Sequence, residues 1–105
     1  MVRTGGMNAY PAEIEPVLRS HAKVRAVAVV GIPHADWGEM VVACVVAEHG
    51  CSEAEIMEYC RPRLAPHKRP KHVKFMNALP ENQVGKVIKR ELRDLLIKEF
   101  NGVMR

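Results

Sequence analysis

Lys86, which follows Gly85, is an unusually placed lysine that could act on a negatively charged group. The glycine permits backbone conformations that other residues avoid, and few acidic residues stand near Lys86 to neutralise it. The pair is not a Walker A phosphate loop, because that motif requires a glycine where Pro80 stands and a Ser or Thr where Val87 stands. Two interpretations of Lys86 remain open: an acting cation in a mobile loop, or an ordinary surface lysine.

Two other segments are suited to anions. Lys68, Arg69 and Lys71 lie in a proline-flanked segment, and their charges, with the bidentate geometry of arginine, suit phosphate groups. Gly5 and Gly6 form a permissive stretch in which backbone amides can approach a ligand closely. The alternatives are a solvated basic loop for the first segment and, favoured by the sequence alone, a simple chain turn for Gly5 and Gly6.

The cysteines and histidines do not form a recognisable site. The chain has three cysteines, with no C-x-x-C pair and no histidine at zinc-ligand spacing beside them. The five histidines share no metal spacing and fit no Ser-His-Asp order. We therefore predict reduced cysteines that serve packing, no metal site and no catalytic histidine. These residues are Cys44, Cys51, Cys60, His21, His34, His49, His67 and His72.

Periodicity and turn residues predict the elements that position these side chains. A proline and acidic residues favour a helix over 11–21, and a capping box at Ser52 and Glu55 predicts one over 52–63. An amphipathic helix is expected over 89–100, and the proline-flanked segment 65–71 is expected to be non-helical. Strands are expected over 24–32, 40–47 and 72–76, the first two antiparallel because their connection is short. The pattern predicts an α+β fold, a small three-stranded, mainly antiparallel sheet with about three packed helices.

Composition fits one domain over residues 1–105. The chain is 48% hydrophobic and 27% charged, which excludes disorder as the main interpretation. No apolar run is long enough to span a membrane, so we expect no membrane span and a cytoplasmic location. The net charge of +4 is uneven: residues 1–60 hold 4 basic and 8 acidic side chains, and residues 61–105 hold 12 and 4. A basic half indicates a polyanionic partner or merely a solvated face.

The order of several short motifs carries more information than any one of them. Taken together they resemble the C-terminal domain of acyl-CoA synthetases, in the adenylate-forming ligase superfamily, over roughly residues 2–96. The Asn8-Ala9-Tyr10-Pro11 segment is more similar to acyl- or aryl-CoA ligases than to peptide-synthetase domains. The motifs are Gly5-Gly6-x-Asn8-x-Tyr10-Pro11-x-Glu13-Ile14-Glu15, Val27 to Pro33, Trp37-Gly38-Glu39, Lys68-Arg69-Pro70-Lys71 and Pro80-x-x-x-x-Gly85-Lys86-Val87-x-x-Arg90.

The resemblance implies an activity and a set of site residues. Such ligases use ATP and Mg²⁺ to convert a fatty or aryl acid to an acyl-adenylate, and then transfer the acyl group to coenzyme A. A small C-terminal domain rotates between the two steps. Lys86 matches the catalytic lysine of adenylation, Gly5 and Gly6 match the loop that admits the pantetheine of CoA, and Arg69 and Lys71 match positions that contact the CoA nucleotide.

The same resemblance implies that the chain is one part of an enzyme. The N-terminal domain, which would bind ATP, Mg²⁺ and the acid, is absent from this sequence, so we expect the isolated domain to be inactive. Its expected partners are that N-terminal domain, the carboxylic acid and CoA, with no nucleic acid. Two alternatives remain: an orphan interaction domain of the same fold without catalysis, and a basic nucleic-acid-binding module. The low aromatic content, 5%, and the lack of RNA-binding motifs weaken the second.

Overall fold

A computed structural model of the chain describes residues 1–36 and 38–103. The Trp37 of the Trp37-Gly38-Glu39 motif lies outside the described residues. The elements, in chain order, are β1 (Val2–Thr4), β2 (Met7–Ala9), α1 (Pro11–Arg19), β3 (Val24–His34), β4 (Gly38–Ala47), α2 (Glu53–Cys60), a 3₁₀ turn η1 (Pro66–Lys68), β5 (His72–Phe75) and α3 (Lys89–Val103).

The sheet has five strands, so the prediction of three was wrong in number although the α+β class is confirmed. The antiparallel pairing of β3 with β4 is as predicted and runs from Val24 opposite Ala47 to His34 opposite Gly38. Strand β5 pairs in parallel with the middle of β4, and helix α2 provides the crossover that such a pairing needs. The two strands that we missed, β1 and β2, form a hairpin beside the start of β4.

Gly5 and Gly6 form the turn of the β1–β2 hairpin. Both have positive φ, +60° and +81°, which is the backbone of a two-residue turn whose twist matches the strands on either side. Val2 and Ala9 pair at its base and are buried, which fixes the hairpin to the core. A Gly-Gly pair between short strand-forming segments is a known hairpin signal, but three-residue strands are too short to show alternation.

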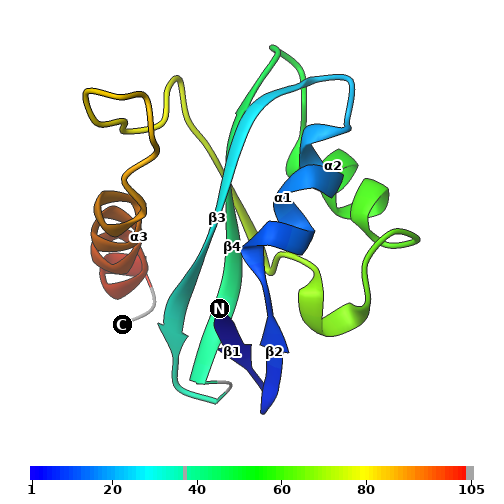
Figure 1. The fold of residues 1–105 in the computed structure, drawn as a ribbon. Coiled ribbons are helices and arrows are strands. Elements are labelled where there is room, and N and C mark those ends of the chain that lie inside the picture. Colours follow the sequence, from blue (N-terminus) through cyan, green and yellow to red (C-terminus); the bar gives the residue numbers. More distant parts are fainter. Residues whose placement is uncertain (37, 104–105) are drawn as a thin grey trace.

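Helices cover both faces of the sheet (Figure 1). Helices α1 and α2 pack on one face through Ile14, Leu18, Ile56 and Cys60, and α3 packs on the other through Leu92 and Leu96. Strands β3 and β4 are buried on both faces, which explains why their sequences are nearly continuous apolar runs. On α3, Leu92 and Leu96 are buried, whereas Leu95 is exposed.

Two local expectations need correction. The segment 65–71 contains the turn η1. Its i to i+3 bonds, from the Lys68 amide to the Ala65 carbonyl (2.9 Å) and from the Arg69 amide to the Pro66 carbonyl (3.4 Å), tolerate a proline at the start of the turn. The capping box at α2 is half formed: the Glu55 amide donates to Ser52 Oγ (3.1 Å), but the Glu55 carboxylate turns to Lys23 and His21.

Among the described residues, no helix combines the length and apolar content that a membrane crossing requires. The expected cytoplasmic location stays a prediction.

Candidate functional site

The loop between β5 and α3 holds Lys86 in a defined backbone. Asn82 organises it: the Asn82 Oδ1 accepts from the amides of Val84 and Lys86, both at 3.0 Å, and the Asn82 amide donates to the Lys86 carbonyl at 2.9 Å. Gly85 closes the turn with φ +82°. Glu81 and Val87 form a β-bridge across its base. The lysine therefore sits on an ordered loop rather than on a loose one.

The side chain of Lys86 is exposed and makes no ion pair or hydrogen bond with the part of the chain that the structure describes. Its neighbour in sequence, Lys89, is by contrast bound to Glu15 at 2.8 Å. An unpaired ammonium on a fixed backbone is available to an anionic group that approaches from outside. Stabilisation of phosphate or carboxylate oxygens is the chemistry that this arrangement allows.

A second candidate site lies at the turn of the β1–β2 hairpin. A cavity of about 290 Å³ separates this turn from η1, and it is lined by Thr4, Gly5, Met7, Pro66, His67 and Lys71. The structure therefore brings together two of the predicted residues, Gly5 and Lys71, which are far apart in the sequence. Gly6 is exposed at the same turn, and among the described residues no atom beyond its own chain neighbours lies within 4 Å of the position that a Cβ would take there.

Arg69 has a different environment from Lys71. Its guanidinium donates from Nε to the Leu64 carbonyl and from Nη2 to the Arg61 carbonyl, both at 2.9 Å. These carbonyls follow the end of α2, where backbone acceptors lack helical partners, so Arg69 fixes the loop after that helix. A role of Arg69 at a nucleotide stays a prediction; the two bonds use two of the five N–H donors of its guanidinium.

The two candidate sites lie at opposite ends of the molecule. In Figure 1 the loop between β5 and α3 is at the upper left, and the hairpin turn is at the bottom. Lys86 therefore does not act on the same bound atom as Gly5 and Lys71 while the domain keeps one orientation.

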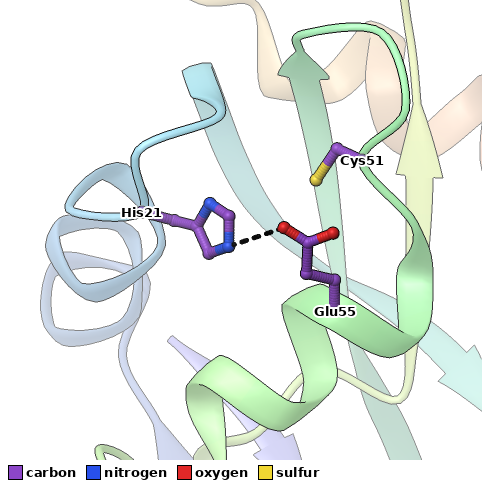
Figure 2. Close-up of side chains that lie close together, drawn as sticks. All are labelled: His21, Cys51 and Glu55. Atoms are coloured by element: carbon purple, nitrogen blue, oxygen red, sulfur yellow. Dashed lines mark ion pairs between the residues drawn. The ribbon is translucent and has the colours of Figure 1, made fainter.

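A third cluster joins residues that the sequence did not link: His21 in the loop between α1 and β3, Cys51 in the loop between β4 and α2, and Glu55 on α2. Figure 2 shows His21, Cys51 and Glu55 facing one another, and one ligand atom from each lies within 4.8 Å of the others. Nitrogen, sulfur and oxygen donors suit Zn²⁺. However, the Lys23 ammonium lies 3.1 Å from the Glu55 carboxylate, where a cation would otherwise bind.

The hydrogen bonding of His21 is also unsuited to a metal. Its Nδ1 accepts from the Lys23 amide at 3.1 Å, which leaves the proton of the neutral ring on Nε2. That proton points to Glu55 Oε2, 3.4 Å away, so Nε2 has no free lone pair for a metal. We interpret the trio as a polar contact that fixes α2 against the end of α1.

Burial governs the chemistry of the thiols. It raises the pKa of Cys44 to about 11, and it also raises the pKa of Cys60 and Cys51, the last with help from the Glu55 charge. A raised pKa keeps a thiol protonated and poorly nucleophilic. The described cysteines are all free, in agreement with the prediction that they are reduced.

The excess of basic residues in the second half is partly neutralised within the molecule. Several of these residues pair with acidic side chains of the first half: Lys68 with Glu13, Lys89 with Glu15, Arg93 with Glu39 and Arg61 with Glu58. Folding therefore pairs part of the basic excess of residues 61–105 with acidic side chains of residues 1–60. The charge asymmetry is for this reason a weaker indication of nucleic-acid binding than the sequence alone suggests.

Comparison with known proteins gives concordant matches. Residues 13–86 match the family described as AMP-binding enzyme C-terminal domain. The long-chain-fatty-acid–CoA ligase FadD13 of Mycobacterium tuberculosis is 48% identical over 95 residues, which are 90% of this chain and 19% of that protein. A 2-succinylbenzoate–CoA ligase of Bacillus cereus is 43% identical over 96 residues, 91% of this chain and 20% of that protein.

Solved structures agree with the sequence matches. A fatty acyl CoA synthetase of Mycobacterium tuberculosis superposes with a TM-score of 0.91 at 46% identity, over 94% of this chain and 20% of that one. ATP-bound MatB from Rhodopseudomonas palustris gives 0.90 at 41% identity, over 95% and 20%. The chain thus spans about one fifth of the length of these relatives, and the resemblance found in the sequence is confirmed.

Proposed function

Because this chain belongs to the family of AMP-binding enzyme C-terminal domains, we propose that it is the mobile C-terminal domain of an AMP-forming acyl-CoA ligase. The proposed reaction converts a fatty or aryl acid, ATP and CoA to acyl-CoA, AMP and pyrophosphate. Residues 1–105 form one domain in this proposal, and its partner is an N-terminal domain that holds the acid, Mg²⁺ and most of ATP. The observation that carries it is a Lys86 without a partner among the described residues, on a loop fixed by Asn82, within a chain of this family.

In the first half-reaction a carboxylate oxygen attacks the α-phosphorus of ATP, and pyrophosphate leaves. Negative charge is redistributed over the carboxylate and α-phosphate oxygens. Lys86 places its ammonium beside these oxygens in a site that closes around them, where a charge is worth more than in water. The fixed backbone of Asn82 to Lys86 limits the reorganisation needed at that moment.

In the second half-reaction the CoA thiol attacks the acyl carbonyl, the C–S bond forms, the thiol proton is released and AMP leaves. We assign this step to the opposite end of the domain. Gly5 and Gly6 present backbone without side chains, which leaves room for the narrow pantetheine arm. Lys71 lines the adjacent cavity of about 290 Å³ and suits a phosphate of CoA. We assign Arg69 to the same phosphate, through the N–H donors of its guanidinium that its bonds to the carbonyls of Leu64 and Arg61 do not use.

A chimera tests the proposal. The chain replaces the corresponding 95 residues of the Mycobacterium tuberculosis ligase FadD13, to which it is 48% identical, and a long-chain fatty acid is supplied. We expect acid-dependent ATP–pyrophosphate exchange, reduced by about 100-fold or more in Lys86→Ala because a transition-state charge is lost. Transfer from supplied acyl-adenylate to CoA should stay within about threefold of the parent, since Lys86 then faces away from the site.

Lys98→Ala is the matched control, because Lys98 is another exposed lysine, on α3, and should leave both steps unchanged. Equal loss of both half-reactions in Lys86→Ala contradicts the proposed role of the lysine. A chimera that folds but performs neither step favours the orphan interaction domain. The nucleic-acid-binding alternative is not favoured by the family match, and it predicts salt-dependent binding of RNA or DNA, which the same chain can be tested for.

A further inference from the structure

Glu39 belongs to a motif that the proposed function does not yet use. It lies near the start of β4, opposite Pro33 of β3 and one residue after Gly38, which pairs with Thr4 of β1. This Thr4–Gly38 pair is the whole β1–β4 register among the described residues. The hairpin that carries Gly5 and Gly6 is therefore joined to the main sheet by few backbone contacts. Glu39 is adjacent to the residue of β4 that makes this contact.

The Glu39 carboxylate provides an additional joint. Its Oε1 accepts a hydrogen bond from the backbone amide of Arg3, at 3.0 Å, within β1. The Glu39 side chain is 28% exposed, whereas Arg3 on the donor side is exposed. Glu39 thus holds the base of the hairpin from a neighbouring strand.

Two other elements shape the place that this carboxylate occupies. On β3, a Cβ added at Gly31 would lie 2.9 Å from Glu39 Oε2 and 2.9 Å from a methyl group of Val2, so the site needs a residue without a side chain. On α3, Arg93 donates from Nε to the Gly31 carbonyl at 3.0 Å, and its Nη2 lies 3.9 Å from Glu39 Oε2. A cavity of about 180 Å³ lined by these residues adjoins the site. The arrangement leaves room for a carboxylate at the foot of the hairpin.

We propose that Glu39 is a positioning residue for the second half-reaction, which fixes the β1–β2 hairpin so that Gly5 and Gly6 meet the pantetheine arm in one geometry. The inference rests on the proposed function. A Gly-Gly turn has little stiffness of its own, and catalytic geometry that shifts by about 1 Å costs on the order of tenfold or more in rate. Stiffness must then come from the strands of the hairpin. The buried Val2–Ala9 pair holds its base, and Glu39 accepts the amide of Arg3, one residue nearer the turn.

The property that matters is acceptance of the amide rather than the charge. The contact to Arg93 is long, at 3.9 Å, and half of the Arg93 side chain is exposed, so this ion pair contributes little. A glutamine at position 39 keeps an acceptor oxygen of the same reach. Glu39→Gln should therefore behave as the parent, and Glu39→Ala should not.

The experiment compares Glu39→Ala, Glu39→Gln and the control Glu58→Ala in the chimera described above. Glu58 is an exposed acid of α2 that pairs with Arg61 alone among the described residues. We expect Glu39→Ala to slow transfer from acyl-adenylate to CoA about tenfold while ATP–pyrophosphate exchange is unchanged, and the other two variants to stay within about twofold of the parent. Equal loss of both steps, no loss in either, or a Gln variant as slow as the Ala variant would each overturn the proposal.

A second measurement does not depend on catalysis. Amide hydrogen exchange of the 105-residue chain should show faster exchange at Arg3 in Glu39→Ala and parent-like protection in Glu39→Gln. Unchanged protection in Glu39→Ala contradicts the anchoring role. If the chimera with the parent sequence is inactive, the proposed function fails, and exchange at Arg3 still decides whether Glu39 anchors the hairpin.

Discussion

At the scale of single residues, Asn82 determines how precisely Lys86 is presented. Its Oδ1 accepts two amides, those of Val84 and Lys86, at 3.0 Å each. We predict that Asn82→Ala slows ATP–pyrophosphate exchange in the chimera about tenfold, because the lysine backbone loses its fixed position. Unfolding free energy should fall by only about 1 kcal/mol, since the loop is exposed and each bond contributes modestly.

Asn82→Asp keeps the acceptor oxygen of this residue and replaces its amide group with a carboxylate. The carboxylate keeps an acceptor for both amides, so amide protection at Val84 and Lys86 should be retained in hydrogen exchange. Gln83→Ala, a substitution of the exposed neighbouring residue, is the control and should change neither exchange nor activity. If Asn82→Ala leaves the adenylation rate intact, the ordered loop is unnecessary for Lys86.

Cys44 makes stability depend on pH in the alkaline range. Burial raises the pKa of its thiol from 9.0 to about 11, with Lys74 partly opposing and Glu99 adding to the shift. Below about pH 9 both folded and unfolded chains keep the proton. Between about pH 9 and 11 the unfolded chain loses it first, so the free energy of unfolding falls as pH rises, by at most roughly 2–3 kcal/mol.

Urea unfolding at several pH values from 8 to about 11 measures this effect. Cys44→Ala removes the thiol, so its stability should depend less steeply on pH than that of the parent, although its stability at pH 8 is lower because a buried side chain is truncated. Identical pH slopes in the two chains would show that Cys44 does not titrate in this way.

At the scale of elements, Gly31 allows β3, β4 and the hairpin to meet. A Cβ at this position would lie 2.9 Å from both Glu39 Oε2 and Val2 Cγ1. We predict that Gly31→Ala lowers the free energy of unfolding by about 1–3 kcal/mol, the usual range for an overpacked core. Chemical denaturation of the 105-residue chain provides the measurement.

A double-mutant cycle with Val2→Ala identifies the cause. Removing the valine methyl groups opens space beside position 31, so the two substitutions together should cost less than their sum, by about 1 kcal/mol. Additive effects would place the strain elsewhere, and a Gly31→Ala chain as stable as the parent would show that the strands adjust freely.

The elements differ in how well the sequence predicts them. The helices and the strands β3, β4 and β5 were found because each is long enough to show a period or a continuous apolar run. Strands β1 and β2 have three residues each, and only the Gly5-Gly6 turn between them could have revealed the hairpin. The parallel pairing of β5 with β4 depends on packing of α2, which periodicity does not report.

The site residues show the same limit. Lys86 was identified because its motif is local, and its loop is also local, since Asn82 lies four residues away. The contact of Gly5 with the cavity beside Lys71, and that of Glu39 with Arg3, join residues more than thirty positions apart. Such contacts arise from the sheet topology, so spacing along the chain carried no sign of them.

At the scale of the whole molecule, the separation of the two candidate sites has a consequence for catalysis. The Lys86 loop and the hairpin turn lie at opposite ends of the domain (Figure 1). Under the proposed function, one orientation therefore brings only one of them to the acyl group, and the domain must reorient between the two half-reactions. In each half-reaction, a copy of the domain therefore needs only one of its two candidate sites, either the Lys86 loop or the hairpin turn.

This separation predicts complementation between two defective chains. The chain is supplied in trans to a FadD13 N-terminal domain, with the parent chain as the positive control. Lys86→Ala lacks the adenylation end, and Gly5→Val puts a β-branched side chain at φ +60°, which strains the turn of the other end. We expect each variant alone to make acyl-CoA at least about tenfold more slowly than the parent. Their mixture should recover a substantial part of the rate, because one copy forms the acyl-adenylate and the other replaces it for transfer to CoA.

Doubling the concentration of either single variant controls for the amount of protein. A mixture no faster than the better single variant would mean that Lys86 and Gly5 must act from the same copy, which contradicts two independent ends.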